Sequence, residues 1–241
     1  MSSLPIPSRR SLLLGSGTVL VLGLAACGSN DESGTADPGT TSGSSDAGGA
    51  SDGGGTALAN RDIDRSLTYL ELAGASTGPV VDLLLDFRCP PCRFFMESFG
   101  EMFRTQVEQG SLVLRIHPRP MLDLRRGTTF SQDSAAAAAA VYAQDPDLLL
   151  DFEREMYAAQ PETAEQPDPD LEQIAQIAQS IGADETCLQQ IRDRVYVPWT
   201  LDVVEPAAQE LEVGTPTMII DGEIWQGDWT QPGAVEDALG V

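Results

Sequence analysis

Two cysteines separated by two prolines could carry out redox chemistry. Cys89 and Cys92 lie in the stretch "LLLDFRCPPCRFFMESF", where an apolar run gives way to a helical pattern. A disulfide that closes only two residues gains little as a structural link, because stabilisation grows with the length of the closed loop. A zinc site needs four ligands, and His117 is the only histidine of the chain. We therefore expect a redox pair, with no metal and no other cofactor.

The helical pattern after the pair gives each cysteine a role. Phenylalanines recur every fourth residue from position 95 to 103, so the cysteines begin a helix, where free N–H groups and the helix dipole favour a thiolate. We expect Cys89 to be the exposed nucleophile at the helix tip and Cys92 the inward-facing resolving thiol. The helix end should lower the pKa of Cys89. Since Pro90 and Pro91 have no N–H to donate, we do not expect the extreme pKa of a strong oxidant.

Strand patterns surround this helix. Residues 66–72 alternate as a half-buried strand does, and residues 78–87 form an apolar run typical of a central strand. Residues 111–118 are a further strand, so strand, helix and strand form a right-handed βαβ unit. We expect residues 217–225 to form a hairpin around Asp221-Gly222, followed by a last helix over residues 232–239.

Between these strands the pattern is helical. We expect helix throughout residues 128–211, with one long helix over residues 184–211 that is interrupted near Pro198. The six consecutive alanines at positions 135–140 indicate close helix packing. Cys187 is expected to be a small buried hydrophobe and His117 a structural histidine.

The N-terminal segment has the features of an export signal. Arg9 and Arg10 precede an apolar stretch over residues 12–26, which is short for a membrane span, and Cys27 follows. "LAAC" resembles the lipobox of bacterial lipoproteins, which implies that residues 1–26 are a signal peptide and that Cys27 is lipidated after cleavage. The general secretory and twin-arginine routes both fit, and a secreted protein with a free Cys27 is the alternative.

Composition separates a tether from the folded part. Residues 28–60 consist mostly of Gly, Ser, Thr, Ala and Asp, which cannot bury enough surface to fold, so residues 27–60 are expected to be a lipidated cysteine with a disordered tether. The domain then spans residues 61–241. A net charge of −23, with 14 basic against 37 acidic residues, argues against nucleic acid as a partner.

Two distant motifs together resemble a known superfamily. "CPPC" after an apolar strand, with "GTPT" far downstream, resembles the thioredoxin superfamily, and "DFRCPPC" is similar to the D-[YF]-x-C-P-x-C pattern of its DsbA-like branch. "HPRPMLD" and "TTFSQDSAAAA" are similar to segments of actinobacterial members. The resemblance implies an α/β thioredoxin fold with a helical domain inserted at about residues 124–211. It also implies a cis bond between Thr215 and Pro216.

The same resemblance implies the site. Cys89 and Cys92 would be catalytic, and the substrate-binding residues would be Phe87, Pro90, Pro91, Thr215 and Pro216. Relatives often carry a buried acid six residues before the first cysteine, where this chain has Leu83. Asp82 and Asp86 lie nearby but out of register, so we expect the proton of Cys92 to pass through water or another group.

These features predict a membrane-tethered, extracytoplasmic thiol–disulfide oxidoreductase, anchored by lipid to the outer side of the cell membrane. We expect it to act as an oxidant on exported proteins bound as extended chains, and a membrane redox partner would reset its disulfide. A dedicated disulfide reductase is the alternative with the same chemistry. A non-catalytic, peptide-binding lipoprotein with a thioredoxin fold is the alternative from another class.

Overall fold

A five-stranded sheet forms the centre of the molecule. The computed structural model describes residues 62–73 and 78–241, so the expectations for the signal peptide, for Cys27 and for residues 28–60 of the tether lie outside the described residues. The strand order is β1-β3-β2-β4-β5. The strands are β1 (Leu70–Leu72), β2 (Val80–Leu85), β3 (Val113–Pro118), β4 (Thr217–Ile220) and β5 (Glu223–Ile224).

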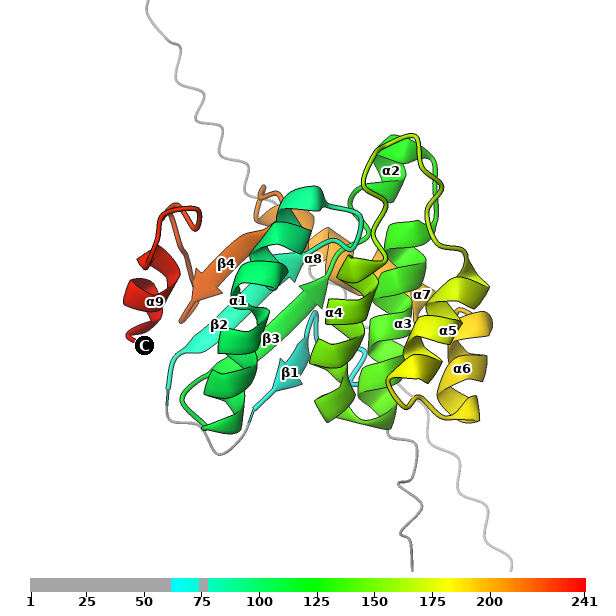
Figure 1. The fold of residues 1–241 in the computed structure, drawn as a ribbon, viewed down its shortest axis with the longest axis horizontal. Helices are drawn as coiled ribbons and strands as arrows, with labels where there is room; N and C mark the ends of the chain where they lie inside the picture. The colour runs from blue at the N-terminus through cyan, green and yellow to red at the C-terminus, as the bar shows by residue number, and fades with distance from the viewer. Residues whose placement is uncertain (1–61, 74–77) are drawn as a thin grey trace, which may run out of the picture. The chain divides into compact units, whose positions relative to one another are not determined.

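The expected βαβ unit is confirmed. β2 and β3 pair in parallel, and helix α1 (Pro90–Glu108) joins them across one face of the sheet (Figure 1). β2 is central and buried on both faces, because Leu83 packs in the main core while Leu84 packs with Ala208 of α8 (Glu205–Glu210) on the other face. The sheet therefore holds the start of α1 rigidly at the carboxyl end of β2.

The first strand is shorter than its sequence pattern predicts. β1 covers only Leu70–Leu72, which pairs antiparallel to β3, whereas an extended strand was expected over residues 66–72. Asp64 explains the difference, since its carboxylate accepts hydrogen bonds from the backbone N–H and the hydroxyl of Ser66. These bonds hold the preceding residues in a turn.

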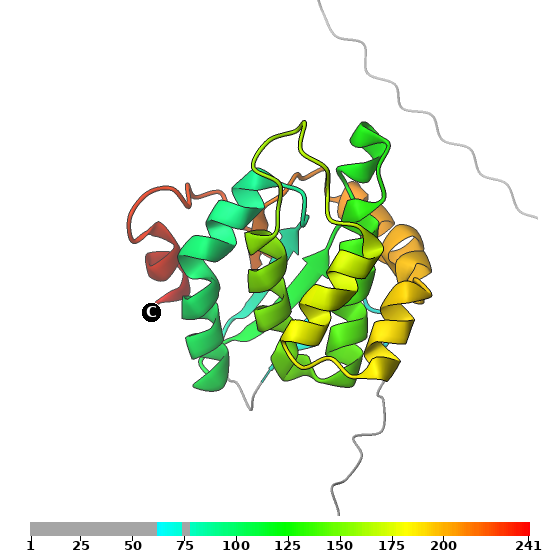
Figure 2. The same ribbon diagram turned by 45° about the vertical axis from the view of Figure 1, so that its right-hand side comes forward.

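Helices fill the chain between β3 and β4 and gather beside the sheet (Figure 2). They are α2 (Asp123–Arg126), α3 (Phe130–Gln144), a 3₁₀ turn (Pro146–Leu148), α4 (Leu149–Ala158), α5 (Leu171–Ser180), α6 (Glu185–Arg192), α7 (Val197–Trp199), a π-helical turn (Thr200–Val204) and α8. The alanines of α3 at positions 135–140 are all buried, which confirms the expected close packing. The result is a thioredoxin-type sheet layer with a helical insertion.

Two details of the helical region differ from expectation. Residues 159–170 are not helical, and three prolines at positions 161, 167 and 169 disfavour a helix there. The expected long helix breaks at Arg194, whose φ of 55° is left-handed, and not at Pro198. Pro198 lies in the first turn of α7, where its missing N–H removes no helical hydrogen bond.

The C-terminal hairpin forms as predicted. Asp221 and Gly222 take φ values of 50° and 84°, the left-handed pair that a tight hairpin between β4 and β5 requires. Helix α9 (Ala234–Leu239) follows, two residues shorter than the range expected. Within the described residues, no helix combines the length and apolarity needed to cross a membrane.

Candidate active site

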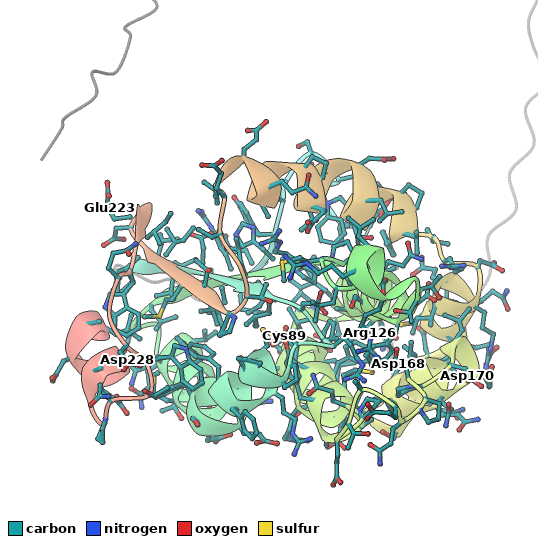
Figure 3. The ribbon with its side chains drawn as sticks, turned by 90° about the horizontal axis from the view of Figure 1, so that it is seen from above. Cys89, Arg126, Asp168, Asp170, Glu223 and Asp228 are labelled. Atoms are coloured by element: carbon teal, nitrogen blue, oxygen red, sulfur yellow. The ribbon has the colours of Figure 1, made fainter. Side chains whose placement is uncertain are left out.

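The two cysteines lie at the start of α1, next to the carboxyl end of β2. Cys89 is the N-cap residue of α1 and Cys92 is in its first turn, and both thiols are free. In Figure 3, Cys89 lies near the middle of the view, with Arg126 and Asp168 on one side and Asp228 on the other. Cys92 is fully buried, as expected. The expectation of an exposed Cys89 is wrong, because only 6% of it is exposed.

The segment before β4 covers Cys89. The Cys89 thiol donates a hydrogen bond of 3.3 Å to the carbonyl oxygen of Thr215, which lies 126 residues further along the chain. The bond between Thr215 and Pro216 is cis, as the resemblance implies. The structure thus brings four of the predicted site residues together: Cys89, Cys92, Thr215 and Pro216.

The environment gives the two thiols opposite acidities. The pKa of Cys89 falls to about 7, chiefly because the Cys92 thiol donates a hydrogen bond to it, while burial opposes the shift. The Thr215 side chain and the backbone N–H of Cys92 also favour the thiolate. Burial raises the pKa of Cys92 well above its ordinary value, and the Cys89 sulfur raises it further. The lowered pKa of Cys89 agrees with expectation, but its largest cause is the neighbouring thiol and not the helix end.

Asp86 fastens the turn between β2 and α1. Its buried carboxylate accepts hydrogen bonds from the backbone N–H groups of Arg88 and Leu122 and from the Ser131 hydroxyl, each 2.8 Å long. Burial nevertheless raises the pKa of Asp86 to about 6. The backbone carbonyl of Asp86 accepts the N–H of Cys89 at 3.0 Å. Asp86 therefore fixes both the end of β2 and the backbone turn that leads to Cys89.

Residues beyond the end of α4 hold the same turn from the helical side. The Gln160 amide donates to the carbonyl oxygens of Phe87, at 2.7 Å, and Cys89, at 3.2 Å. Arg88 forms a buried ion pair with Asp168 and donates to the carbonyl oxygen of Thr163 at 3.0 Å. The sequence analysis missed Gln160 and Asp168, because nothing in their local pattern marks them as partners of a motif about 70 residues away.

A groove lies beside Pro216. It has a volume of about 260 Å³, and its walls include Phe95, Thr217, Trp225 and Trp229. The rings of Phe95 and Trp229 meet edge to face with their centres 5.7 Å apart. The groove therefore offers aromatic surface beside the segment that covers Cys89, with half-buried tryptophans in its wall.

The other predicted substrate-binding residues divide into two groups. Pro90 and Pro91 are exposed at the tip of α1. Phe87 is 2% exposed and packs against Phe152 and Tyr157, with ring centres 6.1 and 5.3 Å away. The structure therefore corrects the prediction for Phe87, which is a core residue and does not line the groove.

The remaining candidates have structural roles. His117 Nε2 lies 2.8 Å from a carboxylate oxygen of Asp82, and both side chains are mostly buried. Cys187 is fully buried, and burial raises its pKa to about 12, which confirms a small buried hydrophobe. Among residues 62–73 and 78–241, no group of three His, Cys, Asp or Glu side chains is placed to hold a metal ion.

Comparison with known proteins agrees with this geometry. The thioredoxin family profile matches residues 71–235. Three solved structures from actinobacteria share the fold. DsbA of Mycobacterium tuberculosis is 22% identical, with a TM-score of 0.63, over 71% of this chain and 90% of the other. The disulfide bond oxidoreductase DsbG of the same species is 21% identical, with a TM-score of 0.62, over 71% and 85%. MdbA of Corynebacterium diphtheriae, a thiol–disulfide oxidoreductase, is 24% identical, with a TM-score of 0.59, over 70% and 88%.

A larger protein also shares part of the sequence. The serine/threonine-protein kinase PknE of Mycobacterium tuberculosis is 29% identical over 124 residues, which is 49% of this chain. The match covers only 22% of the kinase, so this chain spans about a fifth of that relative's length.

Proposed function

The chain belongs to the thioredoxin family, and from that premise we propose that it is a thiol–disulfide oxidoreductase whose redox pair is Cys89 and Cys92. One observation carries the proposal. Two adjacent thiols have pKa values driven apart, to about 7 for Cys89 and well above the ordinary value for Cys92. At neutral pH the first is substantially a thiolate, which is the reactive species, and the second keeps its proton.

The geometry suits exchange through Cys89. In the oxidised protein, a substrate thiolate attacks the Cys89 sulfur, the bond between the two cysteines breaks, and Cys92 leaves with the electron pair. A second substrate thiolate then attacks the substrate sulfur of the mixed disulfide, which releases a substrate disulfide and the Cys89 thiolate. Cys92 is fully buried, so only Cys89 can meet the substrate.

The groove beside Pro216 is the proposed substrate site. Its aromatic wall of Trp225 and Trp229 lies next to the segment that covers Cys89. An extended apolar peptide would lie in this groove, with Thr215 and Pro216 on one side of its sulfur and the exposed Pro90 and Pro91 on the other. Exported proteins that are not yet folded would supply such segments.

We propose oxidation of substrates as the direction. A lowered pKa stabilises the reduced protein and so makes its disulfide more oxidising. A Cys89 pKa of about 7 resembles the value of about 7 in thioredoxin more than the value of about 3.5 in DsbA. We therefore expect a reduction potential between about −120 mV, as in DsbA, and about −270 mV, as in thioredoxin. A value at or below that of thioredoxin would favour the alternative, a dedicated reductase.

The proposed place of action is the extracytoplasmic face of the membrane. The lipobox-like "LAAC", which ends at Cys27, and the tether that follows support a lipid anchor. A membrane redox partner would then restore the disulfide after each turnover by thiol–disulfide exchange at Cys89. Mass spectrometry of the membrane fraction would detect the lipid on Cys27, and Cys27→Ser should release the protein.

The test of the proposed function is oxidative refolding of a reduced substrate protein, with insulin reduction as the reverse assay. Cys89→Ser should abolish both activities, and Cys92→Ser should trap the mixed disulfide. Cys187→Ser is the matched control, because that thiol is buried away from the groove and should leave activity unchanged. Equal activity in Cys89→Ser and the parent would instead support a non-catalytic peptide-binding protein.

A further inference from the structure

Arg119 is a buried charged residue that the exchange reaction described above does not use. Only 2% of it is exposed, and it follows directly after β3. Its guanidinium donates two hydrogen bonds to the buried carboxylate of Glu205 in α8, from Nε at 3.0 Å and from Nη2 at 2.9 Å. The cost of burying two charges largely cancels their attraction. Stability alone therefore does not account for this ion pair.

A further donor of Arg119 reaches the wall of the groove. Its Nη1 donates a hydrogen bond of 2.7 Å to the carbonyl oxygen of Val213. Val213, Gly214 and Pro216 line the groove. The chain turns sharply just before them, because Glu212 has a left-handed φ of 55°. Arg119 therefore holds the residue at which the chain enters the groove wall.

The backbone of Arg119 is bound to the strand that leads to the nucleophile. Its N–H donates a hydrogen bond of 2.7 Å to the carbonyl oxygen of Leu85, the last residue of β2. This bond continues the parallel pairing of β2 and β3 beyond the end of β3. From Leu85 the chain runs through Asp86 to Cys89. One residue thus connects the strand before Cys89 with the groove wall at Val213.

The hydrogen bond of Cys89 cannot hold the groove wall throughout the reaction. The Cys89 thiol donates to the carbonyl oxygen of Thr215, and it has no proton to donate as a thiolate, in the disulfide or in a mixed disulfide. The Thr217 hydroxyl donates to the carbonyl oxygen of Gly214 at 2.9 Å, but both belong to the same segment. The bond from Arg119 comes from outside the segment and involves no reacting atom.

We propose that Arg119 is a positioning residue for the substrate. Together with Glu205 it keeps the groove wall in one place in both redox states, so that an extended peptide binds at a constant position relative to Cys89. The two bonds to Glu205 fix the plane of the guanidinium, which directs the remaining donor at Val213. The inference rests on the oxidoreductase function and the groove proposed above. A small dithiol, which does not fill the groove, should not need this wall.

The test replaces the ion pair by apolar residues. The double variant Arg119→Met with Glu205→Leu leaves neither charge unpaired, and such replacements are often neutral or stabilising. Gln209, which donates to Glu205, is exposed and can turn to water. The rate at which the disulfide form oxidises an extended apolar peptide with two cysteines is measured against peptide concentration. This gives a half-saturating concentration and a maximal rate, and dithiothreitol serves as the small dithiol.

We expect the half-saturating peptide concentration of the double variant to rise about fivefold or more, because a mobile wall must be ordered on binding. The maximal rate and the rate with dithiothreitol should stay close to those of the parent. Arg119→Lys keeps a charge for Glu205 but lacks the planar fork of donors, so it should show the same rise. Arg104→Lys is the matched control, because Arg104 pairs with Asp151 at 2.8 Å and does not line the groove.

An unchanged half-saturating concentration in a folded double variant would overturn the proposal. An equal loss of rate with the peptide and with dithiothreitol would also overturn it, because the change would then act at the Cys89 sulfur and not on binding. A parent that oxidises neither dithiol would overturn the proposed function itself, so the two failures are distinguishable. Thermal midpoints establish which variants fold, and Arg119→Lys decides the outcome where the double variant does not.

Discussion

Two carboxyl groups are buried in the core, one at the end of β2 and one on α4, and they differ in their partners. Asp86, at the end of β2, accepts three hydrogen bonds, and its pKa is about 6. Glu153, on α4, accepts none among the described residues, and its pKa is about 8. Burial is nearly complete for both, so the hydrogen bonds decide which one is charged at neutral pH.

Because their partners differ, the two carboxyl groups have different roles. The sheet side fixes geometry, since Asp86 ties the turn before Cys89 to α2 and α3 through donors that stay in place. The helical side holds a group that can lose its proton without breaking any hydrogen bond. The charged carboxylate of Asp86 therefore serves as a scaffold, whereas the carboxyl group of Glu153 keeps its proton at neutral pH.

Removing the scaffold carboxylate should have the largest effect on stability. Asp86→Ala leaves two backbone N–H groups and the Ser131 hydroxyl without an acceptor in a buried site. We expect the free energy of unfolding to fall by about 3 kcal/mol or more in urea denaturation, because each unpaired buried donor costs about 1–3 kcal/mol. Ser131→Ala, which removes one of the three bonds, should lose only about 1 kcal/mol. Equal losses in both variants would contradict the scaffold role.

Replacing the neutral Glu153 should change the free energy of unfolding less, and by an amount that depends on pH. The folded state raises the pKa of Glu153 from 4.5 to about 8, so its contribution to stability is complete below pH 4.5 and is lost as pH rises through about 8. Between pH 6.5 and pH 8, the disulfide form of the parent should lose up to about 1.4 kcal/mol per pH unit relative to Glu153→Gln.

The disulfide form is the right sample for that comparison, because neither Cys89 nor Cys92 titrates in it. Asp86, with a pKa of about 6, is also largely ionised over this range. Parallel stability curves for the parent and Glu153→Gln would contradict a carboxyl group that stays protonated in the folded state.

The sequence could predict the features that depend on local patterns, but not those that depend on contacts between distant residues. The central strand, α1 and the Asp221-Gly222 turn follow from local patterns, because each depends on neighbours in the chain. The cis bond between Thr215 and Pro216 was implied by the resemblance to the superfamily. The exposure of Cys89 was predicted wrongly, since the group that covers it, the carbonyl of Thr215, is 126 residues away. Phe87 was misplaced for a similar reason, because its packing partners lie on α4.

No local sequence pattern predicted the buried positions or the contacts of the residues in and after α4. Glu153 lies in "DFEREM", where a glutamate among charged residues indicates a solvated helix face, yet it points into the core. The amide of Gln160 finds its acceptors only in the folded protein. The absence of an acid at Leu83 predicted only that the proton of Cys92 passes through water or another group, and no local pattern identifies that group.

The most direct test of the redox pair is the ultraviolet absorbance of the Cys89 thiolate as a function of pH in the reduced protein. We expect a midpoint at about pH 7. In Cys92→Ala the midpoint should move toward 9, because the hydrogen bond from Cys92 is the largest cause of the shift. A midpoint near 9 in the parent, or one near 3.5 as in a strong oxidant, would contradict an active site in which one buried thiol tunes the other.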